Sequence, residues 1–185
     1  MRVTVQDARL SFPDLHEAVQ FQGSGAFNYR ATFLLDPDSK STVEIDAAIE
    51  AVAKAKWGAK APAILKSIEG SSGKFCFVSG DSKDYDGYEG KMALSASRPV
   101  DKGRPTIIDR DKSPLVAADG KPYGGCFVNA IVEFWAQDNS YGKGIRCTLL
   151  GVQFLRDGDS FSAGAPPSGA DAFESLGDAP ADSLV

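Results

Sequence analysis

Hydrophobic and polar positions alternate along the first part of the chain with a period of two, which is typical of β-strands. Residues 2–10 form one such run and residues 28–35 form a second. The pair Phe12-Pro13 predicts the end of the first strand, and the glycines within residues 18–27 predict a loop or hairpin. Two neighbouring strands are therefore expected at the start of the fold.

The hydrophobic period then changes to that of an α-helix. Within residues 45–56 apolar side chains recur at i, i+4 and i+7, and the alanines between them raise helix propensity. Ser41 or Thr42 is the expected N-cap. A second, shorter helix is expected at residues 61–68, where a proline stands near the first turn. Together these patterns predict a helical insert at about residues 42–68.

Strand patterns return after the insert. We expect strands near residues 74–79, 91–98, 127–136 and 144–155, with a short strand at 106–108 inside a long connection, residues 99–125. The last two long strands flank a glycine-rich stretch, residues 138–144, which predicts a hairpin. Five or six short strands with a helical insert predict a mainly β (α+β) domain, either a barrel or a Greek-key sheet.

Length and composition suit one domain with a tail. The sequence has 185 residues, of which 43% are hydrophobic, and no apolar run approaches the ~18 residues of a membrane span. The first residues already follow the strand pattern, without the apolar core of a signal peptide. We therefore expect a cytoplasmic protein with no membrane partner.

The cysteines and the one histidine offer little for chemistry. Cys76, Cys126 and Cys147 lie far apart, each inside an apolar run, and their odd number and lack of a CxxC pair argue against disulfides or a zinc site. We expect them to be small buried hydrophobic side chains. No neighbouring residues suggest a catalytic role for His16. A protein without enzyme activity, cofactor or metal is expected.

Charge divides the chain at Arg156, the last basic residue. All 20 Lys and Arg residues lie at or before it, whereas six of the 25 carboxylates follow it. A nearly neutral body with an acidic tail suggests a body that binds a polyanion and a tail that competes with it or recruits other partners. Because Ser, Gly, Ala, Pro and Asp dominate after Asp157, we expect a folded domain at 1–157 and a disordered tail at 158–185.

The first candidate binding segment is residues 79–91, where tyrosines and lysines alternate with carboxylates and glycines. Tyr85 and Tyr88 have little core to enter in such a loop, so we expect exposed rings on which bases can stack. Lys83 and Lys91 stand beside them and can neutralise phosphates. The alternative is a polar hairpin whose tyrosines pack back on the sheet edge.

The same segment leaves a metal site open as an alternative, since it holds four carboxylates between Asp81 and Glu89. A calcium loop needs oxygen ligands at alternate positions before its glycine, but position 82 is a serine and the glutamate comes too early. Solvated carboxylates are the better interpretation. A metal-dependent nuclease that uses the Asp81–Glu89 cluster stays a rival hypothesis.

Two further segments carry candidate contacts. The connection at 99–125 is rich in Lys and Arg and ends in Tyr123 and two glycines, although aspartates dilute its charge. The hairpin tip at 141–144 combines a tyrosine, a lysine and two glycines, which let a backbone approach a phosphate closely. Phe134 and Trp135 alternate, so one of them should face the core and the other solvent.

Several ordered blocks resemble the OB-fold single-stranded DNA-binding protein family of tailed bacteriophages, formerly a domain of unknown function. The blocks are residues 80–90 (GDSKDYDGYEG), 123–130 (YGGCFVNA), 141–145 (YGKGI) and 150–158 (LGVQFLRDG), and the likeness spans most of residues 1–158. The resemblance implies an OB-like barrel of five or six strands that binds single-stranded DNA without sequence preference, in phage DNA replication or recombination.

The tail is similar to the acidic C-terminal tails of bacterial and phage single-stranded DNA-binding proteins. Such tails recruit replication partners and compete with DNA, which implies that this tail also contacts replication or recombination proteins. The expected contacts are Asp171, Phe173, Glu174, Asp178 and Asp182. The end of the chain departs from the bacterial tip, which has a bulkier hydrophobic pair after a longer acidic run.

These observations predict a groove in which aromatic rings stack bases and cations follow the phosphates. The expected stacking residues are Tyr85, Tyr88, Tyr123, Trp135 and Tyr141. The expected phosphate contacts are Lys74, Lys83, Lys91, Arg98, Arg104, Lys143 and Arg146. Self-association is left open. Besides the nuclease, the second rival is a β-rich structural or virion protein that binds no nucleic acid.

Overall fold

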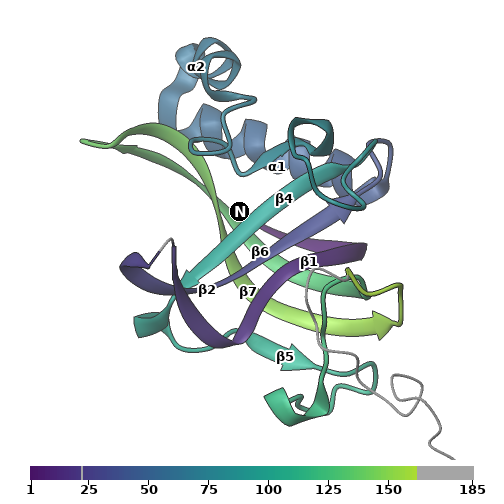
Figure 1. Cartoon of the computed structure of the whole chain (residues 1–185). Coiled ribbons are helices and arrows are strands. Elements are labelled where there is room, and N and C mark those ends of the chain that lie inside the picture. The colour runs from purple at the N-terminus through teal and green to yellow at the C-terminus, as the bar shows by residue number, and fades with distance from the viewer. Residues whose placement is uncertain (22, 162–185) are drawn as a thin grey trace, which may run out of the picture.

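The computed structural model describes residues 1–21 and 23–161, and Figure 1 shows a strongly curved sheet with two helices at one end. Within these residues the elements are, in chain order, β1 (Arg2–Phe21), β2 (Ser24–Leu35), α1 (Lys40–Trp57), α2 (Ala61–Ile68), β3 (Phe77–Ser79), β4 (Met92–Pro99), β5 (Thr106–Ile108), β6 (Phe127–Asn139) and β7 (Gly142–Arg156). Short 3-10 turns lie at η1 (Gly58–Lys60), η2 (Gly80–Ser82), η3 (Val100–Lys102) and η4 (Ala117–Asp119).

Five strands close into a barrel. In the described part of the chain the strand order is β3-β4-β2-β1-β6-β7-β5, and a parallel bridge between Ser97 of β4 and Thr148 of β7 joins the two sides of the sheet. β1, β2, β4, β7 and β6 thus form a closed circuit, and β3 and β5 extend it. This closure confirms the expected OB-like barrel, in place of an open sheet.

β1 is longer than its sequence pattern predicts. The predicted end at Phe12-Pro13 is wrong, because the strand continues to Phe21. The register against β2 shifts between Ser11 and Asp14, and Phe12 has a positive φ of 45°. This bulge bends the strand and places the proline, which has no N–H to donate, where the hydrogen-bond ladder is already interrupted. The Phe12 side chain is left exposed on the outer surface.

The helical insert lies between β2 and β3 and covers one end of the barrel (Figure 1). The N-cap of α1 is Ser39, earlier than predicted, and its hydroxyl oxygen accepts a hydrogen bond from the Thr42 N–H at 3.2 Å. The helix ends at Gly58, whose φ of 56° favours a residue without a Cβ. α2 occupies the predicted residues. The buried side of α1, including Ile45 and Ile49, joins the barrel core.

Strand periodicity decides which side chains fill the barrel. On β6, Phe134 is 1% exposed and Trp135 is 45% exposed, so the first faces the core and the second faces solvent. Cys76, Cys126 and Cys147 are free thiols buried in the core, as predicted. Burial raises the pKa of Cys126 to about 11 and raises the pKa of Cys147. Both stay neutral thiols, which are poor nucleophiles.

The packed part of the chain reaches past the expected domain boundary at residue 157, because residues 158–161 contact the barrel. The tail residues for which partner contacts are predicted lie outside the described residues; they are Asp171, Phe173, Glu174, Asp178 and Asp182. Among the residues that are described, no helix is long and apolar enough to cross a membrane.

Candidate nucleic-acid interface

An open groove of about 1120 Å³ crosses the outer surface of β2, β4 and β7. Its floor includes small side chains, among them Thr32, Ser95, Ser97 and Thr148. The alternation along β4 explains this floor, since Leu94 is buried in the core while Ser95 and Ser97 are exposed on the outside. Small outward residues keep the path open between bulkier walls.

Aromatic side chains from β1 and the β3–β4 loop form one part of the groove. Phe12 and Tyr85 are 56% and 53% exposed, and their ring centroids lie 4.9 Å apart at an angle of 71°. Tyr88 contacts Tyr85 edge-on at 5.2 Å but is only 3% exposed, and its hydroxyl donates to Ser11 Oγ at 2.9 Å. Burial raises the pKa of the Tyr88 phenol. Tyr88 therefore supports the two exposed rings.

Trp135 contributes an aromatic wall on the β6–β7 side of the groove. Its indole N–H donates to Thr148 Oγ1 at 3.2 Å, which fixes the ring while much of it stays exposed. Arg146 is the cross-strand partner of Trp135 on β7, and its Nε donates to Gln137 Oε1 at 2.9 Å. A flat ring and a guanidinium thus lie side by side on the outer face.

Cations outnumber carboxylates in the groove. Within the described residues its basic side chains are Arg30, Lys83, Arg98, Lys102 and Arg146, and its carboxylates are Asp14 and Glu133. Both carboxylates are already paired: Asp14 accepts from Arg30 at 3.1 Å, and Glu133 accepts from Arg2 at 3.2 Å. The excess of cations therefore attracts a polyanion. The exposed rings favour a nucleic acid whose bases are unpaired, because unpaired bases can stack on them.

Comparison with known proteins identifies the family. Over residues 1–184 the sequence matches the family described as Enterobacter phage Enc34, ssDNA-binding protein. The chain belongs to the Enc34 family of single-stranded DNA-binding proteins. This confirms the resemblance found in the sequence blocks. It also agrees with the prediction of a protein that is not an enzyme, because the family consists of DNA-binding proteins.

Relatives of the Enc34-family chain match along most of its length. Putative protein p50 of Acyrthosiphon pisum secondary endosymbiont phage 1 is 50% identical over 171 residues, which are 91% of this chain and 90% of that protein. The single-stranded DNA-binding protein from bacteriophage Enc34 in complex with ssDNA has a TM-score of 0.72 and 25% identity, covering 87% of this chain and 89% of that one. The single-stranded DNA-binding protein gp2.5 of bacteriophage T7 shares the fold, with a TM-score of 0.57 at 11% identity and coverage of 90% and 98%.

Six of the residues predicted for DNA contact line the groove of this Enc34-family protein: Tyr85, Tyr88, Trp135, Lys83, Arg98 and Arg146. They come from the β3–β4 loop and from β4, β6 and β7, so the barrel brings together segments that are far apart in sequence. Tyr88 lines the groove but cannot stack on a base in this conformation, because its ring is buried.

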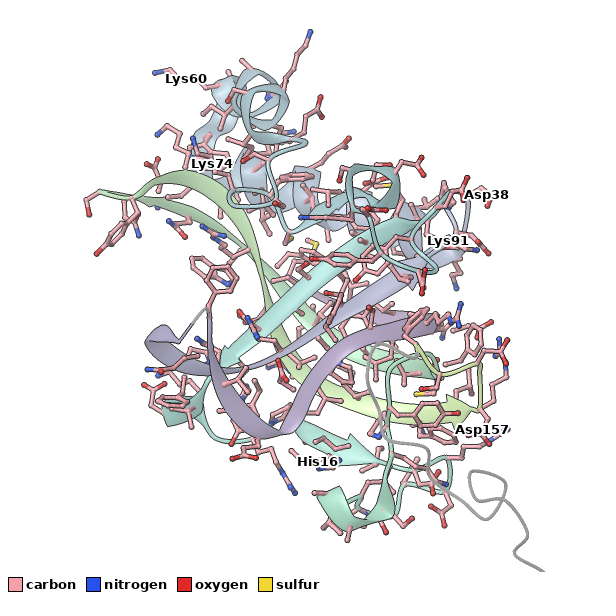
Figure 2. All side chains as sticks on the ribbon, in the orientation of Figure 1. His16, Asp38, Lys60, Lys74, Lys91 and Asp157 are labelled. Carbon is pink, nitrogen blue, oxygen red and sulfur yellow. The ribbon has the colours of Figure 1, made fainter. Side chains whose placement is uncertain are left out.

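The other six predicted contacts do not line the groove: Tyr123, Tyr141, Lys74, Lys91, Arg104 and Lys143. The Tyr123 hydroxyl donates to Asp157 Oδ1 at 2.7 Å, and burial together with this carboxylate raises the pKa of its phenol. Lys91 forms an ion pair with Asp36. Figure 2 shows Lys74 beside the helical insert and Lys91 on the other side of the same view, so these lysines serve different parts of the surface.

Tyr141 and Lys143 lie on the β6–β7 hairpin, which projects past the barrel next to α2 (Figure 1). Tyr141 is 89% exposed at the tip. Asp138 holds this arm to the helical insert, because it accepts from the Trp57 indole N–H at 2.9 Å. It also accepts from Lys143 Nζ, on the same arm, at 2.8 Å. These two donors lower the pKa of Asp138. The tip of the arm is therefore a candidate contact surface outside the groove.

One carboxylate of the rival nuclease site, Asp81, has a structural partner. Asp81 Oδ1 accepts from the Gly90 N–H at 2.8 Å, which closes the loop that carries Tyr85 and Tyr88. Within residues 1–21 and 23–161, no group of three or more His, Cys, Asp or Glu side chains is arranged to hold a metal ion.

Sequence reasoning missed four aromatic or basic residues of the groove: Phe12, Phe21, Arg30 and Lys102. The position of Phe12 in the groove was not predicted, because a Phe-Pro pair predicts a strand end rather than a bulge. Arg30 lies in an alternating strand, where a cation is expected simply to face solvent. In the structure its guanidinium carbon lies 5.9 Å from the Phe21 ring centroid. An aromatic residue beside a proline inside a long alternating run is the one signal that could have pointed to Phe12.

Proposed function

We propose that this chain binds single-stranded DNA without sequence preference and acts in phage DNA replication or recombination. The observation that carries the proposal is the groove, where exposed rings of Phe12, Tyr85 and Trp135 stand among an excess of cations. Membership of the Enc34 family supports it. The solved complex of the Enc34 protein with ssDNA, which has the same fold, supports it further.

The mechanism follows from the chemistry of the lining. Bases of a single strand stack on Tyr85, Phe12 and Trp135, each stack contributing about 1–3 kcal/mol. Lys83 and Arg146 neutralise phosphates along the strand. Rings and cations contact features that all nucleotides share, which favours binding without sequence preference. A duplex hides its base faces and cannot make the stacking contacts.

We also propose that the acidic tail competes with DNA for this groove and contacts replication or recombination proteins. Its carboxylates at 171–182 complement the cations of the groove in charge. The last described residue, Phe161, contacts Gly87 of the Tyr85–Tyr88 loop, so the tail starts beside the groove. A chain that ends at Phe161 should therefore bind single-stranded DNA more tightly than the full chain, most clearly at low salt.

Fluorescence anisotropy tests the function directly. Labelled oligo-dT and a duplex of the same length are titrated with the full chain over a range of salt concentrations. The proposal predicts salt-sensitive binding to the single strand and much weaker binding to the duplex. Equal affinity for both, or no binding to either at low salt, would remove the function. Loss of labelled oligonucleotide in Mg²⁺ would instead support the nuclease.

A further inference from the structure

Residues 157–161, here called the strap, leave the end of β7 and fold back onto the barrel. Two hydrogen bonds to one phenol begin the contact. The Tyr123 hydroxyl donates to Asp157 Oδ1 at 2.7 Å, and the same oxygen accepts from the Gly158 N–H at 3.2 Å. Figure 2 shows Asp157 at the end of the molecule opposite Lys60 and the helical insert. The strap thus starts from a fixed point.

Arg9 of β1 holds the rest of the strap. Its Nε donates to the Gly125 carbonyl at 3.2 Å, and its Nη2 donates to the Asp159 carbonyl at 2.7 Å. Its guanidinium carbon also lies 4.1 Å from the Phe161 ring centroid, within the range of a cation–π contact. The Phe161 N–H donates to the Gly124 carbonyl at 3.0 Å. One arginine therefore contacts both the backbone and the ring of the strap.

Three glycines make room for the strap. A Cβ at Gly125 would lie 2.1 Å from the Asp159 carbonyl oxygen, and a Cβ at Gly158 would lie 2.2 Å from the Gly125 carbonyl oxygen. A Cβ at Gly87 would lie 2.6 Å from the Phe161 ring. Side chains at positions 125 and 87 would collide with the strap, and one at position 158 would collide with the barrel, so this close approach depends on glycine.

The Phe161 ring also reaches the hydrophobic cluster below the β3–β4 loop. That cluster consists of Leu34, Val78, Tyr88 and Ala93, with Phe161 packed against it. Tyr88 in turn contacts Tyr85 in the groove, and Tyr85 contacts Phe12. Phe161 therefore packs against the cluster that holds Tyr88, and Tyr88 packs against the exposed aromatic part of the groove.

From this packing we infer that Phe161 is a positioning residue for base stacking in the groove, acting through Tyr88 on Tyr85. This inference rests on the proposed function. Phe161 itself does not line the groove. Its ring fills the space under the loop, limits the tilt of Tyr88, and so holds Tyr85 in a stacking orientation. The chain that precedes the acidic tail is thus part of the binding domain.

Phe161→Ala in the full-length chain tests the inference. We expect its affinity for oligo-dT to fall about fivefold or more, near the lower end of the effect of losing one stacked base. Affinity for an abasic oligonucleotide of equal length and charge should change less than about twofold. Phe161→Leu, which keeps apolar packing, should restore most of the oligo-dT affinity.

Leu115→Ala is the control for general destabilisation, because it removes a buried core side chain outside the groove. It should lower the melting temperature at least as much as Phe161→Ala and leave oligo-dT affinity unchanged. If it weakened oligo-dT binding to the same degree, the effect of Phe161→Ala would be ordinary destabilisation, and the inference would fail.

Gly87→Ala and Gly90→Ala form a second, matched pair in the same loop. Both glycines have positive φ, 83° and 69°, so both substitutions strain the backbone. Only the Cβ at position 87 meets the Phe161 ring, whereas position 90 has no atom within 4 Å. The inference predicts weaker oligo-dT binding for Gly87→Ala than for Gly90→Ala, and equal affinities would contradict it.

Different results would overturn the proposed function and the positioning role of Phe161. If the unmodified chain bound no single strand, the proposed function would fall and the strap with it. If the unmodified chain bound oligo-dT and Phe161→Ala bound it equally well, only the positioning role of Phe161 would be overturned. A loss of affinity that is equal for oligo-dT and the abasic strand would also overturn it, because the effect would then not act through stacking.

Discussion

The Tyr88 hydroxyl donates a hydrogen bond of 2.9 Å to the Ser11 hydroxyl oxygen and joins the β3–β4 loop to the bulge of β1. Both residues are 3% exposed, so the bond is shielded from water. We predict that Tyr88→Phe lowers the free energy of unfolding by about 1–2 kcal/mol, because a buried polar partner is left unsatisfied. Urea unfolding followed by circular dichroism measures this change.

Tyr85→Ala is the matched comparison for Tyr88→Phe. Tyr85 is half exposed, and within the described residues its hydroxyl makes no hydrogen bond, so its loss should hardly change stability. It should instead weaken binding of oligo-dT by about 1–3 kcal/mol. If the two variants had the same effects on unfolding and on binding, the division between a supporting ring and a stacking ring would be wrong.

The two tryptophans should respond differently to DNA. Trp135 lines the groove and is 45% exposed, whereas the Trp57 indole is bonded to Asp138 on the projecting arm. We predict that oligo-dT quenches the fluorescence of the full chain and of Trp57→Phe, because a stacked base contacts Trp135. Trp135→Phe should lose most of the quenching. Quenching that instead disappears in Trp57→Phe would place the strand on the arm.

The salt dependence of binding should separate cations in the groove from cations outside it. Lys83→Ala or Arg146→Ala should each lower the slope of log K against log salt by ~0.7, the value for one phosphate contact on a single strand. Lys91→Ala is the control, since Lys91 is paired with Asp36 and does not line the groove. A lower slope for Lys91→Ala alone would contradict the groove as the DNA path.

Alkaline pH should destabilise the fold through Cys126. Burial raises its pKa from 9.0 to about 11, so the folded state favours the neutral thiol. The stabilisation is complete below pH 9, the ordinary value, and is lost as the pH rises through about 11. We predict that unfolding free energy measured in urea falls more steeply from pH 9 to 11 in the unmodified chain than in Cys126→Ala. Parallel curves would show that this thiol does not contribute.

Local patterns predicted the elements of the fold but left open whether they close into a barrel or form a Greek-key sheet. Hydrophobic periods of 2 and 3.6 residues predicted the long strands and both helices. Because neighbouring side chains of a strand point to opposite faces, Phe134 and Trp135 of β6 had to face opposite sides. Closure depends on a pairing of Ser97 with Thr148, which are far apart in sequence and have no distinctive side chains. The bulge at Phe12 also follows from tertiary packing, since a Phe-Pro pair alone favours a strand end.

The candidate site was predicted in part for the same reason. Composition identified the residue types that bind a single strand, and the fold then divided them by position. Tyr88 is removed from solvent by a cluster that includes Leu34, and Lys91 is occupied by Asp36. Tyr123 binds the strap through Asp157. Such partners are distant in sequence, so charge and aromatic content could not reveal them.

Photo-cross-linking of oligo-dT to the full chain, followed by mass spectrometry of the peptides, tests most directly that the groove across β2, β4 and β7 is the DNA path. The account predicts adducts on Tyr85 and Trp135, with Phe12 as a third site. Adducts confined to Tyr123 or Tyr141, which do not line the groove, would contradict it.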